Sequence, residues 1–175
     1  MIRFVIADYY VVLLYIMKID ICCVGKVKEA SFREMINEYS KRLSRYANLS
    51  IIEVADEKTP DNASEVVEEG IKKKEGERLL AAIKDNAFVI ALVIDGKNLS
   101  STELAEKIDS LGIGGVSHIQ FVIGGSLGLS PEVLGRADMK LSFGRMTFPH
   151  QLMRVILLEQ IYRSYRIINH EPYHK

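Results

Sequence analysis

The chain has 175 residues and no net charge; 48% of the residues are hydrophobic and 26% are charged. This balance is typical of one globular domain that buries about two-thirds of its unfolded surface. It argues against a protein that grips naked nucleic acid without sequence preference, because such proteins carry a positive excess. A local basic patch or a large structured partner is compatible with it.

The first sixteen residues, MIRFVIADYYVVLLYI, are apolar and aromatic and are interrupted by Asp8. They are too short to cross a bilayer and lack the basic start and small-residue cleavage site of a signal peptide. We interpret Met17 as the natural start, residues 1–16 as an upstream extension and 17–175 as a single domain. A membrane or targeting role for the extension is the alternative, and N-terminal mass spectrometry of the native protein distinguishes the two.

The next segment alternates strands and helices. A buried strand is predicted over 19–24, followed by a helix over 32–46 that Ser31 caps, with Glu34 completing a capping box. A second strand is predicted over 49–54 and a long helix over 64–84. Cys22 and Cys23 are neighbours on the first strand and therefore point to opposite faces, so we expect two reduced core residues in a reducing, cytoplasmic compartment.

The second half continues the alternation. An apolar strand over 87–94 is expected to turn out at Asp95-Gly96-Lys97, and Ser100 or Ser101 is expected to cap a helix over 103–110. Glycines 112, 114 and 115 are expected to end that helix. Further strands are predicted over 118–123 and 139–143, a short helix after Ser130, and a final apolar helix over 151–168.

This order predicts an α/β protein with a mostly parallel sheet covered by helices on both faces. In such sheets ligands bind at the carboxyl ends of the strands. The loops that follow Ile94, Ile123 and Phe143 are therefore where we expect chemistry. The four histidines (His118, His150, His170 and His174) lack the spacing of metal ligands, so no metal is expected.

The loop that begins at Gly124 leaves a strand and enters a capped helix. Its residues, Gly124-Gly125-Ser126-Leu127-Gly128, fit neither the dinucleotide fingerprint nor the phosphate-binding P-loop. Glycines allow backbone amides to approach a ligand closely, and helix N-termini favour polar groups. A purely structural turn is the alternative.

The loop over 142–150 contains three large apolar residues, Phe143, Met146 and Phe148. Loops rarely hold so many unless an apolar or aromatic group docks on them, although packing on the sheet explains them equally well. Arg145, Thr147 and His150 supply polar groups between.

The last helix is apolar on nearly every side, which predicts a second burial partner. A homodimer is the economical explanation, and a fully enclosed helix is the alternative. Glu159 and Arg163 are spaced to pair. The polar tail, 169–175, is either disordered or folds over a substrate base.

Taken together, these motifs resemble a known family. From Met17 to Lys175 the chain is similar to small bacterial methyltransferases of the SPOUT superfamily, which modify N3 of a pseudouridine in large-subunit (23S) ribosomal RNA. The motifs that carry the resemblance are Cys23-Val24-Gly25-Lys26, Lys74-Glu75-Gly76-Glu77, Asp95-Gly96-Lys97, the run from Phe121 to Leu129, Met146-Thr147-Phe148-Pro149-His150 and Pro172-Tyr173-His174-Lys175.

The resemblance implies a SPOUT fold with a C-terminal trefoil knot, a homodimer and the cofactor S-adenosylmethionine. By matching position, the cofactor site would comprise Leu92, Gly124, Phe143, Gly144, Arg145, Met146, Thr147 and Phe148. The candidates for the substrate side are His150, Arg154, Tyr173 and His174, whose individual roles are hypotheses.

Neutral charge and the lack of a separate RNA-binding domain then predict the assembled ribosome as substrate, with local basic residues between 26 and 45 as contacts. Two alternatives are a SPOUT enzyme for another RNA such as transfer RNA and a ribosome-binding protein without catalysis. A dinucleotide oxidoreductase fits poorly because the glycine spacing is wrong.

Overall fold

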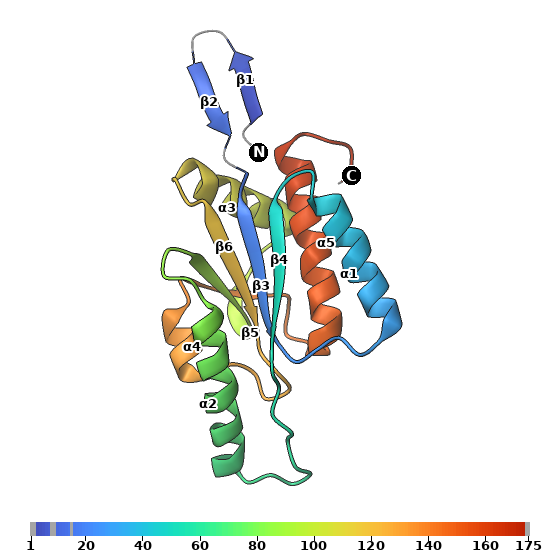
Figure 1. The fold of residues 1–175 in the computed structure, drawn as a ribbon, viewed down its shortest axis with the longest axis vertical. Helices are drawn as coiled ribbons and strands as arrows, with labels where there is room; N and C mark the ends of the chain where they lie inside the picture. The colour runs from blue at the N-terminus through green and yellow to red at the C-terminus, as the bar shows by residue number, and fades with distance from the viewer. Residues whose placement is uncertain (1–2, 8–9, 15, 174–175) are drawn as a thin grey trace.

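The computed structural model describes residues 3–7, 10–14 and 16–173. Its main body is a sheet in the order β4-β3-β6-β5-β7, in which every neighbouring pair is parallel (Figure 1). These strands are β3 (Lys18–Val24), β4 (Asn48–Val54), β5 (Phe88–Asn98), β6 (His118–Ile123) and β7 (Met139–Ser142). Before them, β1 (Arg3–Ala7) and β2 (Tyr10–Leu14) form a separate antiparallel pair. The predicted α/β class is confirmed.

Helices cover both faces of the main sheet. One face carries α1 (Ala30–Leu43), α3 (Ser101–Ile113) and α5 (His150–Ile168), and the other carries α2 (Glu65–Ala82) and α4 (Pro131–Arg136) (Figure 1). Strand β3 serves both cores because its side chains alternate. Cys23 packs in the first core and Cys22 in the second, and both are free and fully buried, as predicted. Burial raises the pKa of the Cys22 thiol to about 12, so it is inert as a nucleophile.

Helix α5 lies between α1 and α3 and against the sheet. Leu157, Leu158 and Ile161 are completely buried, and the flanking Val155 and Tyr165 nearly so. A single chain therefore encloses most of the apolar sides of this helix. The burial of α5 thus agrees with the alternative of a helix enclosed by its own chain, and the apolar composition of the helix does not by itself require a homodimer.

Across the described ranges, no helix has the length and apolarity needed to cross a membrane.

Two of the three predicted helix caps are confirmed. Ser100 and Glu103 form the reciprocal capping box of α3, and Ser130 accepts a hydrogen bond from Val133 N–H at the start of α4. The capping box predicted at Ser31 is wrong, because α1 begins at Ala30, two residues before the predicted start, and Ser31 lies inside its first turn.

The physical reason is that side chains of α5 and α1, and not a capping side chain, hold the segment before α1. Lys28 N–H donates to the Gln151 side chain of α5 (2.7 Å), and the Arg33 guanidinium donates to the Val27 carbonyl (3.1 Å). These contacts fix the entry of the chain into α1 without a side-chain cap.

The predicted turn at Asp95-Gly96-Lys97 is also wrong, because these residues lie within β5. Leu92 and Lys97 both pair with Leu141 of β7, so the residues between them form a bulge. A Cβ atom at Gly96 would lie 2.7 Å from the Leu141 carbonyl carbon, so only glycine permits this contact. The bulge displaces the end of β5 at the edge of the sheet where ligands are expected.

Candidate active site at the carboxyl edge of the sheet

The glycine loop after β6 is a tight backbone structure. Gly124 is buried, and a Cβ atom there would lie 2.6 Å from the carbonyl carbon of Gly128. Gly128 donates its N–H to the Gly125 carbonyl (3.2 Å) and has a φ of +86°, a conformation that favours glycine. These glycines are thus required by the fold of the loop.

The loop after β7 is anchored to the bulge of β5. The Ser142 hydroxyl donates to the Ile94 carbonyl (2.8 Å) and accepts the N–H of Gly144 (3.1 Å), whose φ is +120°. Asn98 donates to the Ser142 carbonyl (3.2 Å). Sequence reasoning did not select Ser142 or Asn98, because a serine at a strand end gives no signal of its partners.

Apolar side chains of the candidate cofactor site are only partly covered. Leu92, Phe143 and Phe148 are half-buried against the main core. Met146 is 71% exposed, and its neighbours Arg145 and Thr147 are exposed as well. An exposed methionine between half-buried phenylalanines leaves apolar surface available to a ligand.

The structure brings the predicted cofactor residues to one edge of three adjacent strands. Leu92 pairs with Leu141 next to the 143–148 loop, and one residue earlier Ala91 pairs with Val122, close to Gly124. A cavity of about 280 Å³ adjoins this edge; its lining residues are Asn98, Leu99, Ser100, Ser101, Leu104, Leu141, Ser142, Phe143 and Gln160. Phe143 is the predicted cofactor residue among them.

His150 is the first residue of α5 and is partly buried. Burial lowers the pKa of its imidazole, the nearby Arg154 cation lowers it further, and Asp56 opposes them. The imidazole is therefore neutral at pH 7 and has a nitrogen that can accept a proton.

Arg154, one helical turn along α5, is completely buried. Its guanidinium donates to Glu53 Oε1 (2.7 Å) and to the carbonyls of Val24 (2.7 Å) and Gly25 (2.8 Å). It thus fastens α5 to the carboxyl ends of β3 and β4 and has no open surface. Arg154 therefore stabilises the position of the helix that carries His150.

Tyr173 lies apart from His150. Its hydroxyl donates to Glu159 (3.2 Å), and its ring meets Tyr162 edge-on with centroids 5.1 Å apart. Burial and then Glu159 raise its pKa to about 12. Glu159 is more than two helical turns from His150, roughly 14 Å at the rise of an α-helix. One chain therefore does not bring these two candidates together, and His174 lies outside the described residues.

The tail up to Tyr173 is folded against α1 and α5. Glu171 accepts from the Tyr46 hydroxyl (2.5 Å) and pairs with Arg166 (2.9 Å). The predicted pair of Glu159 and Arg163 is confirmed at 2.6 Å.

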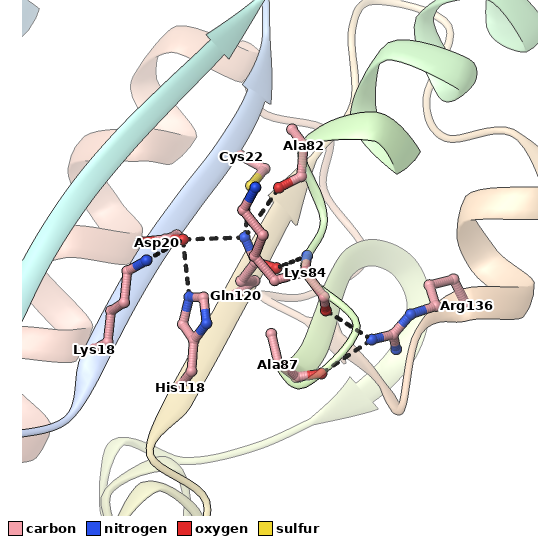
Figure 2. A network of polar contacts seen from close by, with 9 residues as sticks. All are labelled: Lys18, Asp20, Cys22, Ala82, Lys84, Ala87, His118, Gln120 and Arg136. Atoms are coloured by element: carbon pink, nitrogen blue, oxygen red, sulfur yellow. Dashed lines mark hydrogen bonds and ion pairs between the residues drawn. The ribbon is translucent and has the colours of Figure 1, made fainter.

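A second polar cluster lies at the opposite, amino edge of the sheet (Figure 2). Asp20 Oδ2 is 2.8 Å from His118 Nε2 and accepts from Gln120 Nε2 (3.1 Å), while Gln120 Oε1 accepts from Lys84 N–H (2.6 Å). All three residues are at most 5% exposed. The cluster connects the end of α2 to β3 and β6 and thus has a structural role.

In the part of the chain that is described, no three potential metal ligands come together.

Comparison with known proteins assigns the class. The family model described as a predicted SPOUT methyltransferase matches residues 17–174. A probable methylase family protein from Haemophilus influenzae has a similar fold, with a TM-score of 0.53 at 14% identity over 90% of this chain and 70% of that one. The chain belongs to the SPOUT methyltransferase family.

Closer relatives share one name. Proteins called Ribosomal RNA large subunit methyltransferase H from Bifidobacterium animalis, Bifidobacterium adolescentis and Clostridium novyi are 64%, 65% and 65% identical to this chain. In each case the match covers 91% of this chain and 100% of the relative.

Proposed function

We propose that this protein uses S-adenosylmethionine to methylate N3 of a pseudouridine in 23S ribosomal RNA on the assembled ribosome. The observation that carries the proposal is the full-length similarity, near 65% identity, to proteins named as large-subunit ribosomal RNA methyltransferases. The domain that acts is residues 17–175, and the trefoil knot implied by the family belongs to this proposal. Truncation of residues 1–16 should leave cofactor binding unchanged.

The residues at the carboxyl edge fit the cofactor. Gly124 is packed against the backbone of Gly128, which fixes the shape of the loop, and Leu92, Phe143 and Phe148 offer partly covered apolar surface to an adenine ring. Exposed Met146, with backbone groups of Gly144, Arg145 and Thr147, would complete the contacts. When bound, the cofactor would supply an electrophilic methyl group, activated by its positively charged sulfur, and a neutral thioether would be left after the transfer.

The chain's own contribution is orientation and proton transfer. The N3 proton of the base must leave, and the neutral imidazole of His150 is suited to accept it. Arg154 holds the helix that carries His150, through its bonds to Val24 and Glu53. Tyr173 and His174 are proposed to contact the substrate.

A homodimer reconciles these assignments. Because His150 and Tyr173 lie far apart in one chain, a site that uses both requires the tail of a second chain. Equal mixing of a His150→Ala variant and a Tyr173→Ala variant tests this, since one site in the mixed dimer would be intact. Partial recovery of activity supports the shared site, and its absence, with mixed dimers shown to form, contradicts it.

Substrate choice is tested with intact ribosomes, protein-free ribosomal RNA and transfer RNA as methyl acceptors. Incorporation into ribosomes alone is expected, because the chain has no net charge with which to hold naked RNA. Its exposed basic residues on and beside α1, such as Lys28, Lys41 and Arg45, would contact the ribosomal surface.

The decisive experiment is mass spectrometry of 23S ribosomal RNA from a deletion strain, with and without the restored gene. Loss and return of one methylated pseudouridine are expected. Unchanged ribosomal RNA together with methylated transfer RNA would identify a different target. Calorimetry with S-adenosylmethionine tests for a ribosome-binding protein without catalysis, which would not bind the cofactor.

A further inference from the structure

Glu75 is a buried carboxylic acid beside the glycine loop, in the middle of α2, and it is only 4% exposed. Its Oε1 accepts the N–H of Glu57 (2.9 Å). Its Oε2 is buried and has no hydrogen-bond partner. An unsatisfied buried oxygen is costly, and native proteins contain few of them.

The unpaired oxygen faces the glycine loop. A Cβ atom on Gly125 would lie 2.7 Å from Glu75 Oε2 and 3.2 Å from Val24 Cγ1. The neighbouring Gly76 is pressed against Ser130, where a Cβ atom would overlap the hydroxyl. Helix α2 thus lies against the glycine loop through Glu75 and against the start of α4 through Gly76.

The charges around Glu75 do not explain its presence. Asp56 and Glu57 come from the segment after β4, and Arg78 comes from α2 itself; Arg78 is already paired with Glu57. Gly125 and Val24, which also lie close to Glu75 Oε2, carry no charge. Burial, and then Asp56, raise the pKa of Glu75, while its bond from Glu57 N–H and the Arg78 cation lower it. The ionised group is disfavoured where it stands, and such groups are typical of functional positions.

We infer that Glu75 is a positioning residue for the methyl donor, acting through the loop Gly124–Gly128. When the donor binds, a loop N–H turns to Glu75 Oε2 and fixes the loop in the form that holds the ligand. This inference rests on the proposed function, because it takes the glycine loop as part of the donor site.

The test is calorimetry of S-adenosylmethionine binding with Glu75→Gln, which has nearly the same shape but carries no charge. The affinity for S-adenosylmethionine is expected to fall about tenfold or more, which corresponds to the loss of one hydrogen bond to a charged group. The melting temperature is not expected to fall. The matched control is Glu77→Gln on the exposed side of the same helix, which should bind as the wild type does.

The pH dependence separates positioning from mere packing. Because only the carboxylate accepts the loop N–H at Oε2, wild-type affinity should decline as the pH falls through the raised pKa of Glu75. The decline should be smaller in Glu75→Gln. Identical affinity and identical pH curves in the two proteins would overturn the inference.

A second variant keeps the test decisive if Glu75→Gln folds poorly. Gly125→Ala retains Glu75 but places a methyl group against Oε2, and it should weaken donor binding. Equal binding by folded Gly125→Ala and wild type would overturn the inference. Failure of the wild type itself to bind the donor would instead overturn the proposed function, so the two failures are distinguishable.

Discussion

Polar groups are buried at both the amino and the carboxyl edge of the sheet, but the two edges differ in the partners of those groups. At the amino edge, Asp20, His118 and Gln120 are hydrogen-bonded to one another and to the end of α2 (Figure 2). At the carboxyl edge, Arg154 donates to two backbone carbonyls while its Nε is unpaired, Glu75 Oε2 faces a loop, and Met146 faces solvent.

An unpaired oxygen alone does not distinguish these edges, because Asp20 Oδ1 is unpaired as well. The difference is in charge: Asp20 lies 3.7 Å from the ammonium of Lys18, whereas Glu75 has Asp56 and Glu57 nearby and its neighbour Arg78 is already paired with Glu57. Buried polarity therefore indicates a site only where compensating groups are missing and open, glycine-rich backbone lies beside it.

The largest expected effect is a loss of stability when a buried side chain at the carboxyl edge is removed. Arg154→Ala removes the cation beside Glu53 and the donor to the Val24 and Gly25 carbonyls, so the free energy of unfolding should fall by about 3–5 kcal/mol. Denaturant titration measures it. Arg154→Lys should recover only part of the loss, because one ammonium cannot reproduce the planar guanidinium contacts. Wild-type stability in Arg154→Ala would mean that the buried contacts are not needed.

His150→Ala should reduce methyl transfer to ribosomes by about 100-fold or more with little change in stability or cofactor affinity. Since the pKa of His150 is lowered, the rate should fall only as the pH drops below the ordinary imidazole value. His170→Ala, an exposed histidine in the tail, is the control. Normal turnover by His150→Ala would remove it from the mechanism.

The amino edge should respond in the opposite manner. His118→Ala removes one partner of Asp20 and should lower the free energy of unfolding by about 1–3 kcal/mol. Binding of S-adenosylmethionine, measured by calorimetry, should be unchanged because the cluster is at the far end of the strands. A loss of affinity without a loss of stability would contradict the division between the two edges.

Local patterns predicted most of the fold. The bounds of β6 and the caps at Ser100 and Ser130 follow from apolar runs and short-range hydrogen bonds. Ser31 had an equally good local pattern and failed, since Arg33 and Gln151 hold the start of α1 instead. The bulge in β5 depends on Leu141 in another strand, so its own residues resemble an ordinary turn.

The sequence was sufficient to predict where the candidate site lies, but it did not predict the roles of the individual residues there. Strand ends and glycines indicated the carboxyl edge, whereas the acceptors of Arg154 lie 101 to 130 residues away in the sequence. Glu75 stands in the charged run Lys74-Glu75-Gly76-Glu77, which alone resembles a solvated helix face. Its burial depends on contacts with the distant Glu57 and Gly125.

The smallest expected effect concerns the stability cost of that burial. Glu75 has a raised pKa in the folded protein, so between its unfolded and folded pKa values the folded state holds more protons and wild-type stability falls as the pH rises. Glu75→Gln lacks this proton, and its stability relative to the wild type should therefore increase as the pH rises from 4.5, then level off above the folded pKa. Thermal unfolding of both proteins across pH 4 to 8 measures the difference, with Glu77→Gln as the exposed control. A flat difference would mean that ionised Glu75 is compensated as well as the polar groups of the amino edge, and the contrast between the two edges would lose its electrostatic basis.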